Sequence, residues 1–244
     1  MKHCIILAAG KNSRLDTGKP KSLIEINGMT LMERHIRNFR LVGVESFCVV
    51  TGHNPGPLRD LIPHLASSYG VDIDLVHNER FDLENGYSVS VTENWVNTHG
   101  AEHFFLTMGD HAFQPEFIKA FDEKVSSGKL NSNLILAVDK PGESNRHIDI
   151  EDVTRVLASD QGEILNIGKM IKEYNCYDTG LFLMKSSVFD VLNACFLRGE
   201  YTISNMVTRL IADRQARVLE LSGYLWNDVD NPDDLNTTKK LGFN

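Results

Sequence analysis

The 244-residue sequence predicts an α/β fold built on a mostly parallel central sheet. Largely apolar runs at residues 4–7, 47–50 and 104–108 are short and rich in β-branched or aromatic side chains, which is typical of strands buried on both faces. Segments with helical spacing lie between these runs, and such alternation favours a parallel sheet. Each run ends in small or polar residues, and ligands of open α/β sheets bind at these strand ends.

Composition limits the class of protein. A hydrophobic fraction of 42% over 244 residues is enough for one large α/β domain or one domain with a small insertion. The net charge of −8 argues against a nucleic-acid-binding surface, which needs a dense basic patch. The four cysteines show neither close pairing nor metal-ligand spacing, so we expect reduced thiols in a cytoplasmic protein. We see no signal peptide and no apolar run of membrane-spanning length, and a homodimer is compatible with the sequence.

The first apolar run leads into a loop of unusual composition. Residues 8–10 are Ala-Ala-Gly, and the polar segment after them carries Arg14, Lys19 and Lys21. Small residues after a buried strand let a ligand approach the backbone closely. Backbone N–H groups of such a loop can cradle phosphate oxygens, while the cations add positive charge. An ordinary strand-to-loop turn with solvated cations is the alternative interpretation.

This segment, LAAGKNSRL followed by KPK, resembles the signature loop of nucleotidyltransferases. These enzymes join a nucleoside triphosphate to a phosphorylated sugar, polyol or amino alcohol. Asn12 stands where the usual pattern has a second Gly, and Asn adopts left-handed backbone more readily than most residues. The resemblance implies that Arg14 and Lys21 are catalytic cations that stabilise charge on the reacting phosphates. It also implies that the loop backbone wraps the triphosphate, at Leu7, Ala8, Ala9 and Gly10.

The next elements follow from local signals. Thr30 and Glu33 have the spacing of a capping box at the start of a helix, and Gly43 ends that helix. A weaker helix is expected at residues 55–66, interrupted by Pro63. The strands expected around these helices are residues 23–26, 47–50 and 71–76.

Residues 77–91 form a second candidate binding segment. The Asn85-Gly86 pair predicts a turn, and Ser88 is expected to open a helix that extends to Trp95. Side-chain amides, free backbone and a helix N-terminus can hydrogen-bond a nucleobase edge. On the residues alone, a plain turn and helix cap is the favoured interpretation. The resemblance instead implies a nucleotide-binding role for Asn85, Gly86 and Ser88, because the family's base-recognition loop occurs at this place.

Asp110 follows the strand expected at residues 104–108. A carboxylate at the end of a central parallel strand is costly unless it faces a cleft or a cation. The resemblance implies that Asp110 binds Mg²⁺ bridging the phosphates. A helix at residues 115–126 and a strand at residues 134–138 are expected next.

Between residues 141 and 179 the pattern changes to short alternating segments. A hairpin is expected from residues 153–157 and 163–167, and a strand follows at residues 179–184. The region resembles the acceptor-binding part of inositol-1-phosphate cytidylyltransferases. The shared features are a T-[KR]-V strand, a Gly-Lys after the hairpin and an Asp-Thr-Gly entering the next strand.

This resemblance gives roles to two residues of the inserted region. Lys169 is expected to hold the acceptor's phosphate, and Asp178 a polyol hydroxyl. A surface ion pair between Lys169 and Asp178 is the alternative interpretation of the two residues.

The last part of the chain returns to helices and ends in an acidic segment. Residues 224–235 resemble the family's W-x-D-[IV]-D-T-P-E-D-L motif, and alternation places Asp228 and Asp230 on one face of a strand. Two such carboxylates repel unless a cation lies between them, so we expect one or both to bind the metal with Asp110. Acidic capping of the final helix explains Asp233 and Asp234 only. The preceding elements are expected at residues 187–196, 203–214 and 217–221.

Together these features predict one Rossmann-like nucleotidyltransferase domain at residues 1–244, with an acceptor-binding β insertion at about residues 141–179. The implied reaction joins CTP to a phosphorylated polyol, best represented by inositol 1-phosphate, and releases pyrophosphate, with Mg²⁺ as cofactor. Other acceptors (phosphocholine or a sugar 1-phosphate) and other donors (UTP or dTTP) stay open. Phosphocholine calls for an aromatic cage, and the acceptor region offers chiefly Tyr174 and Tyr177. A non-catalytic nucleotide-binding regulatory module is the alternative of a different class.

Overall fold

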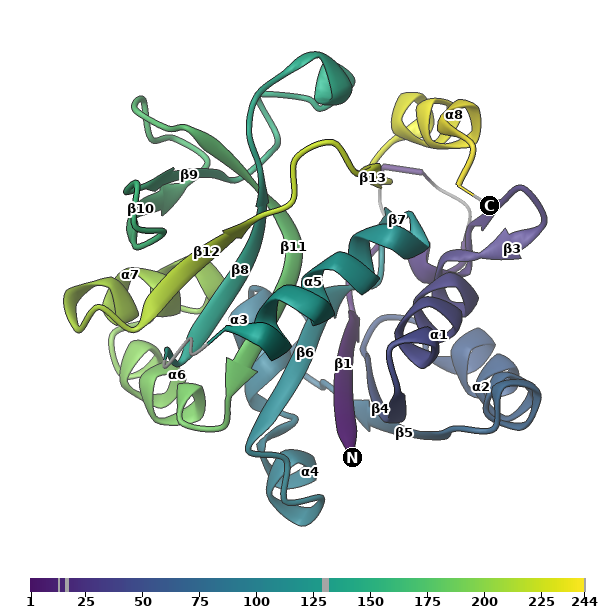
Figure 1. Ribbon diagram of the computed structural model, residues 1–244. Helices are drawn as coiled ribbons and strands as arrows, with labels where there is room; N and C mark the ends of the chain where they lie inside the picture. Colours follow the sequence, from purple (N-terminus) through teal and green to yellow (C-terminus); the bar gives the residue numbers. More distant parts are fainter. Residues whose placement is uncertain (13, 16–17, 129–131, 244) are drawn as a thin grey trace.

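A nine-stranded sheet forms the centre of the protein in the computed structural model, which describes residues 1–12, 14–15, 18–128 and 132–243 (Figure 1). Seven strands follow one another across the sheet, β8 pairs with β11, and β12 pairs with β8. In spatial order the strands are β10 (Ile164–Gly168), β9 (Arg155–Ala158), β11 (Cys176–Lys185), β6 (His103–Met108), β1 (Lys2–Ala8), β4 (Val44–Thr51) and β5 (Asp72–His77), with β8 (Leu134–Asp139) and β12 (Ala216–Glu220) beside β11.

The strand pairings confirm the predicted α/β class. β1 runs parallel to β4 and β6, and β4 runs parallel to β5. β11 is antiparallel to β6 and β8, while β12 is parallel to β8. The hairpin of the inserted region, β9 and β10, joins this same sheet through the first residues of β11. The insertion therefore extends the central sheet, and its proposed boundaries stay a prediction.

β1 is buried on both faces, as its apolar run predicts. Cys4 and Ile6 pack in one hydrophobic cluster, and Ile5 and Leu7 pack in another. The first cluster includes side chains of α1 (Leu31–Leu41), α2 (Gly56–Tyr69) and α5 (Pro115–Ser127). The second includes side chains of α3 (Asn85–Ser90), α4 (Glu93–Thr98), α6 (Val188–Phe196) and α7 (Ile203–Ala212).

The predicted interruption of the second helix is wrong, because α2 continues through Pro63. Proline in a helix interior removes one hydrogen bond and typically costs about 3 kcal/mol. Leu58, Ile62 and Leu65 of this helix are buried, and their burial offsets that cost. The helix ends instead at Gly70, which adopts the left-handed conformation.

The Asn85-Gly86 pair is also placed differently from its prediction. Both residues belong to the first turn of α3, and Trp95 lies in the separate helix α4. A Cβ atom on Gly86 would lie 2.6 Å from the Tyr201 carbonyl oxygen. Close packing against the chain before α7 therefore explains this glycine, rather than a turn.

The C-terminal segment folds over the carboxyl ends of the parallel strands. β13 (Trp226–Asp228) pairs antiparallel with β7 (His111–Phe113), and α8 (Pro232–Leu241) follows. The Asn231 side chain accepts hydrogen bonds from the first backbone N–H groups of α8. Asp228 ends β13 and Asp230 lies beyond it, so the two are not members of one regular strand.

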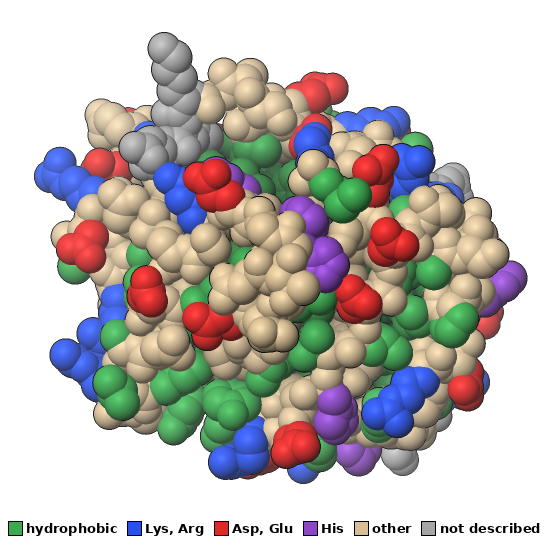
Figure 2. All heavy atoms as spheres, turned by 90° about the horizontal axis from the view of Figure 1, so that it is seen from below, with side chains coloured by type: hydrophobic (Ala, Val, Ile, Leu, Met, Phe, Trp, Pro, Cys, Tyr) green, Lys and Arg blue, Asp and Glu red, His purple; other side chains and the backbone are tan. Residues whose placement is uncertain are grey.

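Two smaller features complete the fold. β2 (Glu25–Ile26) and β3 (Met29–Thr30) form a two-stranded ribbon, and the Thr30 hydroxyl accepts a hydrogen bond from the Glu33 N–H at the start of α1. All four cysteines are buried and free. Within the described residues, no helix combines the length and apolarity needed to cross a membrane. Figure 2 views the end of the molecule where β1 begins, on which several histidine side chains gather.

Candidate active site

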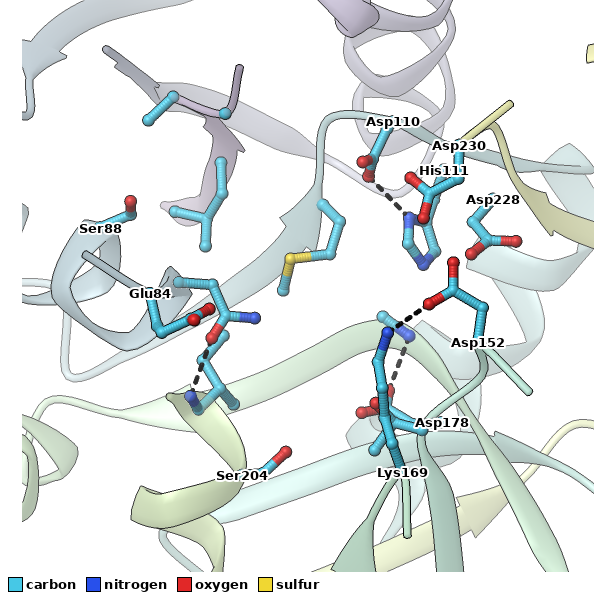
Figure 3. Close-up of a pocket in the computed structure, with 18 of the residues that line it drawn as sticks. Glu84, Ser88, Asp110, His111, Asp152, Lys169, Asp178, Ser204, Asp228 and Asp230 are labelled. Carbon is cyan, nitrogen blue, oxygen red and sulfur yellow. Dashed lines mark hydrogen bonds and ion pairs between the residues drawn. The ribbon is translucent and has the colours of Figure 1, made fainter. Parts of the chain in front are cut away.

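A cavity of about 720 Å³ lies where β1 and β6 end. Polar side chains from segments distant in sequence face one another across it (Figure 3). A smaller adjoining cavity shares Leu7, Gly10 and Asp110 with it and is also lined by Ala8 and Lys21. Of the predicted site residues, Arg14 and Gly86 lie outside both linings. Those that line the larger cavity are Leu7, Ala9, Gly10, Asn85, Ser88, Asp110, Lys169, Asp178, Asp228 and Asp230.

Neighbouring glycines allow the strands to approach the opening loop closely. The Gly109 N–H donates a hydrogen bond to the Leu7 carbonyl oxygen at 2.8 Å, and a Cβ at Gly109 would lie 2.8 Å from that oxygen. A Cβ at Gly52 would lie 2.6 Å from the Ala9 carbonyl oxygen. Gly10 itself has open space where a side chain would begin. The loop backbone is therefore packed from the strands but accessible from the cavity.

Asn12 supports the loop through its side chain. Its amide nitrogen donates a hydrogen bond to the Lys19 carbonyl oxygen at 2.9 Å. Asn12 is not among the residues with positive φ, so the tolerance of Asn for left-handed backbone is not used at this position. Ser13, Asp16 and Thr17, in the same loop, lie outside the described residues.

The two predicted catalytic cations lie among the predicted metal ligands. The Lys21 ammonium is 3.3 Å from Asp110 Oδ2 and forms an ion pair with Asp230 Oδ1. Arg14 Nη2 is 2.7 Å from Asp230 Oδ2. The Lys21 and Asp230 side chains are only 17% and 14% exposed, so their charges are poorly screened by water. Two predicted cations and two predicted carboxylates thus form one charged cluster.

His111 is a member of this cluster that the sequence analysis did not single out. Its Nδ1 lies 3.0 Å from Asp110 Oδ1, and its ring stacks on Trp226 at a centroid distance of 6.4 Å. Gly180 accommodates the ring, because a Cβ at that left-handed glycine would lie 2.6 Å from His111 Nε2. The signal available in the sequence was its position directly after Asp110 at the end of the strand.

Pairing controls the ionisation of these groups. Burial alone would raise the pKa of Asp110, but the hydrogen bond and charge of His111, together with Lys21, hold that pKa well below its usual value. Burial likewise opposes the charged form of Lys21, yet Asp110 and Asp230 outweigh it and raise the Lys21 pKa. The pKa of His111 is raised by Asp110 despite burial.

Asp228 differs from the other two predicted metal ligands. Burial, with the neighbouring charges of Asp230 and Asp110, raises its pKa to about 6. In the described part of the chain its carboxylate takes part in no hydrogen bond or ion pair. A buried carboxylate of this kind is stabilised in its charged form by a cation. The oxygen donors of Asp110, Asp228 and Asp230 suit a hard ion such as Mg²⁺. Across the described residues, however, no three His, Cys, Asp or Glu side chains are grouped closely enough to hold a metal without further ligands.

Asp152 is the second functional candidate that the sequence analysis missed. Its Oδ2 lies 2.8 Å from Arg14 Nη1 and its Oδ1 lies 2.5 Å from the Lys169 ammonium. The hydrogen bond from Lys169, followed by that from Arg14, holds the pKa of Asp152 well below its usual value despite partial burial. No motif marks this residue; only the spatial approach of the segment before β9 to the opening loop reveals it.

Asp178 does not form the alternative ion pair with Lys169. Its Oδ1 accepts a hydrogen bond from the Gly180 N–H at 2.8 Å, while Lys169 pairs with Asp152. Burial raises the pKa of Asp178 to about 6, although the Gly180 hydrogen bond and the His111 charge oppose this shift. Both Lys169 and Asp178 line the cavity, and Figure 3 shows them away from Glu84 and Ser88.

The predicted base-binding residues lie at the other end of the cavity. Asn85 Oδ1 accepts a hydrogen bond from the Ile203 N–H at 2.9 Å and so ties α3 to the start of α7. The Ser88 hydroxyl accepts one from Asn78 at 3.0 Å. Gly86 makes the close contact with the Tyr201 carbonyl described above. Glu84 also lines this end of the cavity (Figure 3). The segment is thus a packed, hydrogen-bonded wall that presents polar groups to the cavity.

The fold and this site define a nucleotidyltransferase. The chain belongs to the family of MobA-like NTP transferase domains, whose model matches residues 4–210. This confirms the family resemblance read from the opening loop and establishes the chain as a member of an enzyme family that transfers nucleotidyl groups.

Two curated relatives with the same name are similar to this chain over nearly its whole length. The sequence is 30% identical, over 97% of its length, to the "Bifunctional IPC transferase and DIPP synthase" of Aquifex aeolicus. It is 32% identical, over 95% of its length, to the protein of the same name from Archaeoglobus fulgidus. The aligned regions cover 50% and 42% of those proteins, so the chain spans about half the length of the curated relatives it matches.

Solved structures agree with this fold over the whole chain. The inositol-1-phosphate CTP transferase from T. maritima superposes with a TM-score of 0.82 at 27% identity and covers 100% of this chain and 98% of that chain. A UDP-glucose pyrophosphorylase complexed with UDP-glucose gives a TM-score of 0.81 at 15% identity, which shows the shared fold alone.

Proposed function

We propose that this protein transfers the cytidylyl group of CTP to a phosphorylated polyol, with inositol 1-phosphate as the acceptor, giving a CDP-polyol and pyrophosphate. The observation that carries the proposal is that one cavity is lined both by the opening loop and Asp110 and by Lys169 and Asp178 of the inserted region. The relatives named IPC transferase and the T. maritima inositol-1-phosphate CTP transferase support the choice of donor and acceptor. The cytoplasmic location and a homodimer stay predictions of the sequence.

The donor would lie along the opening loop. Gly10 leaves the backbone accessible there, and backbone N–H groups suit phosphate oxygens. The base would extend toward α3, where Asn85 and Ser88 line the cavity. Arg14 and Lys21 are paired with carboxylates before substrate binds, so the triphosphate must replace these carboxylates as their partners.

Asp110 with Asp228 or Asp230 would hold Mg²⁺. Mg²⁺ in phosphate-transfer sites is usually bound by one or two carboxylates plus substrate phosphates, which agrees with carboxylates that form no complete cage by themselves. Bound there, the ion would supply positive charge to the phosphate oxygens of the donor.

The remaining chemistry requires positioning rather than a strong base. A phosphate monoester has a second pKa near 6, so the acceptor is already a nucleophilic dianion at neutral pH. Its oxygen would attack the α-phosphorus in line while pyrophosphate leaves. Because two anions must meet, Lys169 would hold the acceptor phosphate, and Arg14 and Lys21 would stabilise the charge that shifts toward the leaving group.

Asp178 would orient the polyol. It lines the same cavity as Lys169, and its ionised form offers acceptor oxygens to ring hydroxyls. Phosphocholine offers no hydroxyl, and its quaternary ammonium requires aromatic faces. Tyr174 lies against Arg155 and Tyr177 is buried, and neither lines this cavity.

The test is pyrophosphate release from CTP, UTP and dTTP, each with inositol 1-phosphate, a sugar 1-phosphate and phosphocholine. We expect turnover with CTP and inositol 1-phosphate to exceed the other combinations clearly. Turnover with another pair would keep the enzyme class but change the substrates. Nucleotide binding without turnover for any pair would favour a regulatory module.

A further inference from the structure

We propose that the Asp152 carboxylate occupies the position of the acceptor's phosphate in the substrate-free protein and competes there with every incoming phosphate ligand. This inference deepens the proposed function and rests on it. It assigns to Asp152 the role of lowering the affinity for phosphate at this position, in addition to Lys169 and Asp178, which bind the acceptor in the proposal.

The geometry of Asp152 is that of a bound anion. Each of its two oxygens pairs with a different cation, Oδ1 with Lys169 at 2.5 Å and Oδ2 with Arg14 at 2.8 Å. Arg14 belongs to the opening loop, and Lys169 directly follows β10. Cations that hold a carboxylate in this way also suit a phosphate, because both ligands present paired anionic oxygens. The two cations therefore converge on a point suited to a phosphate group.

The exposure of the two cations indicates that a phosphate can replace the Asp152 carboxylate. The Arg14 and Lys169 side chains are 54% and 52% exposed, whereas the Asp152 side chain is 26% exposed. Ion pairs of such exposed cations are weak. Arg14 keeps a second partner in Asp230. Among the described residues, Lys169 has no other ion-pair partner, so it is the cation that an incoming phosphate would gain most directly.

Displacement of Asp152 lowers the affinity of every phosphate ligand for these two cations. Every phosphate ligand must overcome the same competing carboxylate at Lys169 and Arg14. A phosphorylated polyol recovers this cost through its hydroxyls, because Asp178 lines the same cavity. Inorganic phosphate has no further group to place there. The carboxylate therefore weakens both ligands by the same factor, and the difference between their affinities comes from the additional contacts that only the polyol makes.

The test measures binding of inorganic phosphate to the nucleotide-free protein by phosphorus NMR titration, in wild type and in Asp152→Asn. We expect the dissociation constant for inorganic phosphate to fall roughly two- to thirtyfold in the variant, the range for two partly exposed ion pairs. Asp160→Asn is the matched control, because it removes one exposed negative charge from the turn between β9 and β10 without touching either cation. It should leave phosphate binding unchanged.

A second pair of variants separates competition from general electrostatics. In a Lys169→Ala background, Asp152→Asn should improve phosphate binding less than it does in the wild-type background. The reason is that one of the two cations for which Asp152 and phosphate compete has been removed. Weaker or unchanged phosphate binding in Asp152→Asn would overturn the inference and make Asp152 a residue that only positions the cations. The outcome is independent of the reaction: cytidylyl transfer without this binding change rejects the inference alone, and the binding change without cytidylyl transfer rejects the proposed function alone.

Discussion

Lys21 and Asp230, which are 209 residues apart in the sequence, form an ion pair in the protein without its substrates. The same ammonium group lies 3.3 Å from Asp110, so one cation bridges two carboxylates proposed as metal ligands. Lys21 thus holds the two acidic groups together in the substrate-free protein, before the proposed metal and nucleotide bind. After they bind, it would be released to the phosphates of the donor.

This relationship predicts the behaviour of the two loop cations. Lys21→Ala and Arg14→Ala should lower the maximal rate of CTP turnover far more than they weaken CTP binding, because each cation acts mainly on charge that shifts in the transition state. Steady-state kinetics and CTP titration measure the two effects separately. Lys140→Ala, which removes a surface lysine paired with Glu220, is the control. Loss of CTP affinity at an unchanged maximal rate would show that these cations bind the ground state only.

Asp110→Asn should abolish turnover while the fold stays intact. The substitution removes a charged oxygen from the proposed metal site and also the negative partner of His111 and Lys21. Loss of such preorganised electrostatic contacts typically costs factors of about 10²–10³ each, and here several are lost together. Asp122→Asn removes a salt-bridged aspartate whose partner is Lys2, at the start of β1, and should leave the rate unchanged. Near-normal turnover by a folded Asp110→Asn protein at ordinary Mg²⁺ would exclude Asp110 from the site.

Much of this site was accessible from sequence because it follows strand ends. Arg14, Lys21 and Asp110 come after two adjacent parallel strands, β1 and β6, whose carboxyl ends must meet. Asp230 joins them because the backbone N–H of Val229 donates a hydrogen bond to the Asp110 carbonyl oxygen. The family motifs supplied that last link, which strand order alone does not give.

The missed residues depend on contacts between distant segments. Asp152 has no motif of its own, and its role appears only where the hairpin region meets Arg14 of the opening loop. The reason for Gly86 lies at Tyr201, more than a hundred positions away, where local turn signals carry no information. The helix was predicted to break at Pro63, but it continues. Burial of neighbouring side chains stabilises the helix more than the low helix propensity of proline destabilises it.

Asp178 predicts a pH-dependent stability difference. Its pKa of about 6 in the folded protein exceeds the usual value near 4 of an unfolded chain, so the folded state favours the protonated carboxyl. Its contribution to the free energy of unfolding is therefore largest below about pH 4 and is lost as the pH rises to about 6. Asp178→Asn keeps an oxygen that accepts the Gly180 hydrogen bond. Because the amide does not ionise, the variant does not lose this contribution to the free energy of unfolding as the pH rises.

Urea unfolding at pH 4 and pH 7.5 measures that difference. We expect Asp178→Asn to equal the wild type at pH 4 and to exceed its free energy of unfolding by roughly 1–3 kcal/mol at pH 7.5. A stability difference that is the same at both pH values would contradict the assigned pKa.

Substitution of the proposed acceptor-binding residues, Asp178 and Lys169, should impair use of the acceptor and leave CTP binding unchanged. Asp178→Ala should lower the acceptor's kcat/KM roughly ten- to a hundredfold, since a hydrogen bond to a charged group is worth about 1.5–3 kcal/mol. Lys169→Ala should weaken the acceptor selectively by removing a cation from its phosphate. CTP binding should barely change in either variant, because the donor is proposed to rest on the opening loop and α3. Loss of CTP affinity in Asp178→Ala would place this carboxylate on the donor instead.

The central claim is that this cavity joins CTP to a hydroxyl-rich phosphorylated acceptor. The most direct measurement compares the kcat/KM of inositol 1-phosphate with that of phosphocholine, using CTP and the wild-type protein, with the CDP-linked product identified by phosphorus NMR. We predict a strong preference for inositol 1-phosphate, and we predict that Asp178→Ala reduces this preference. Equal use of the two acceptors by the wild type would contradict the polyol assignment.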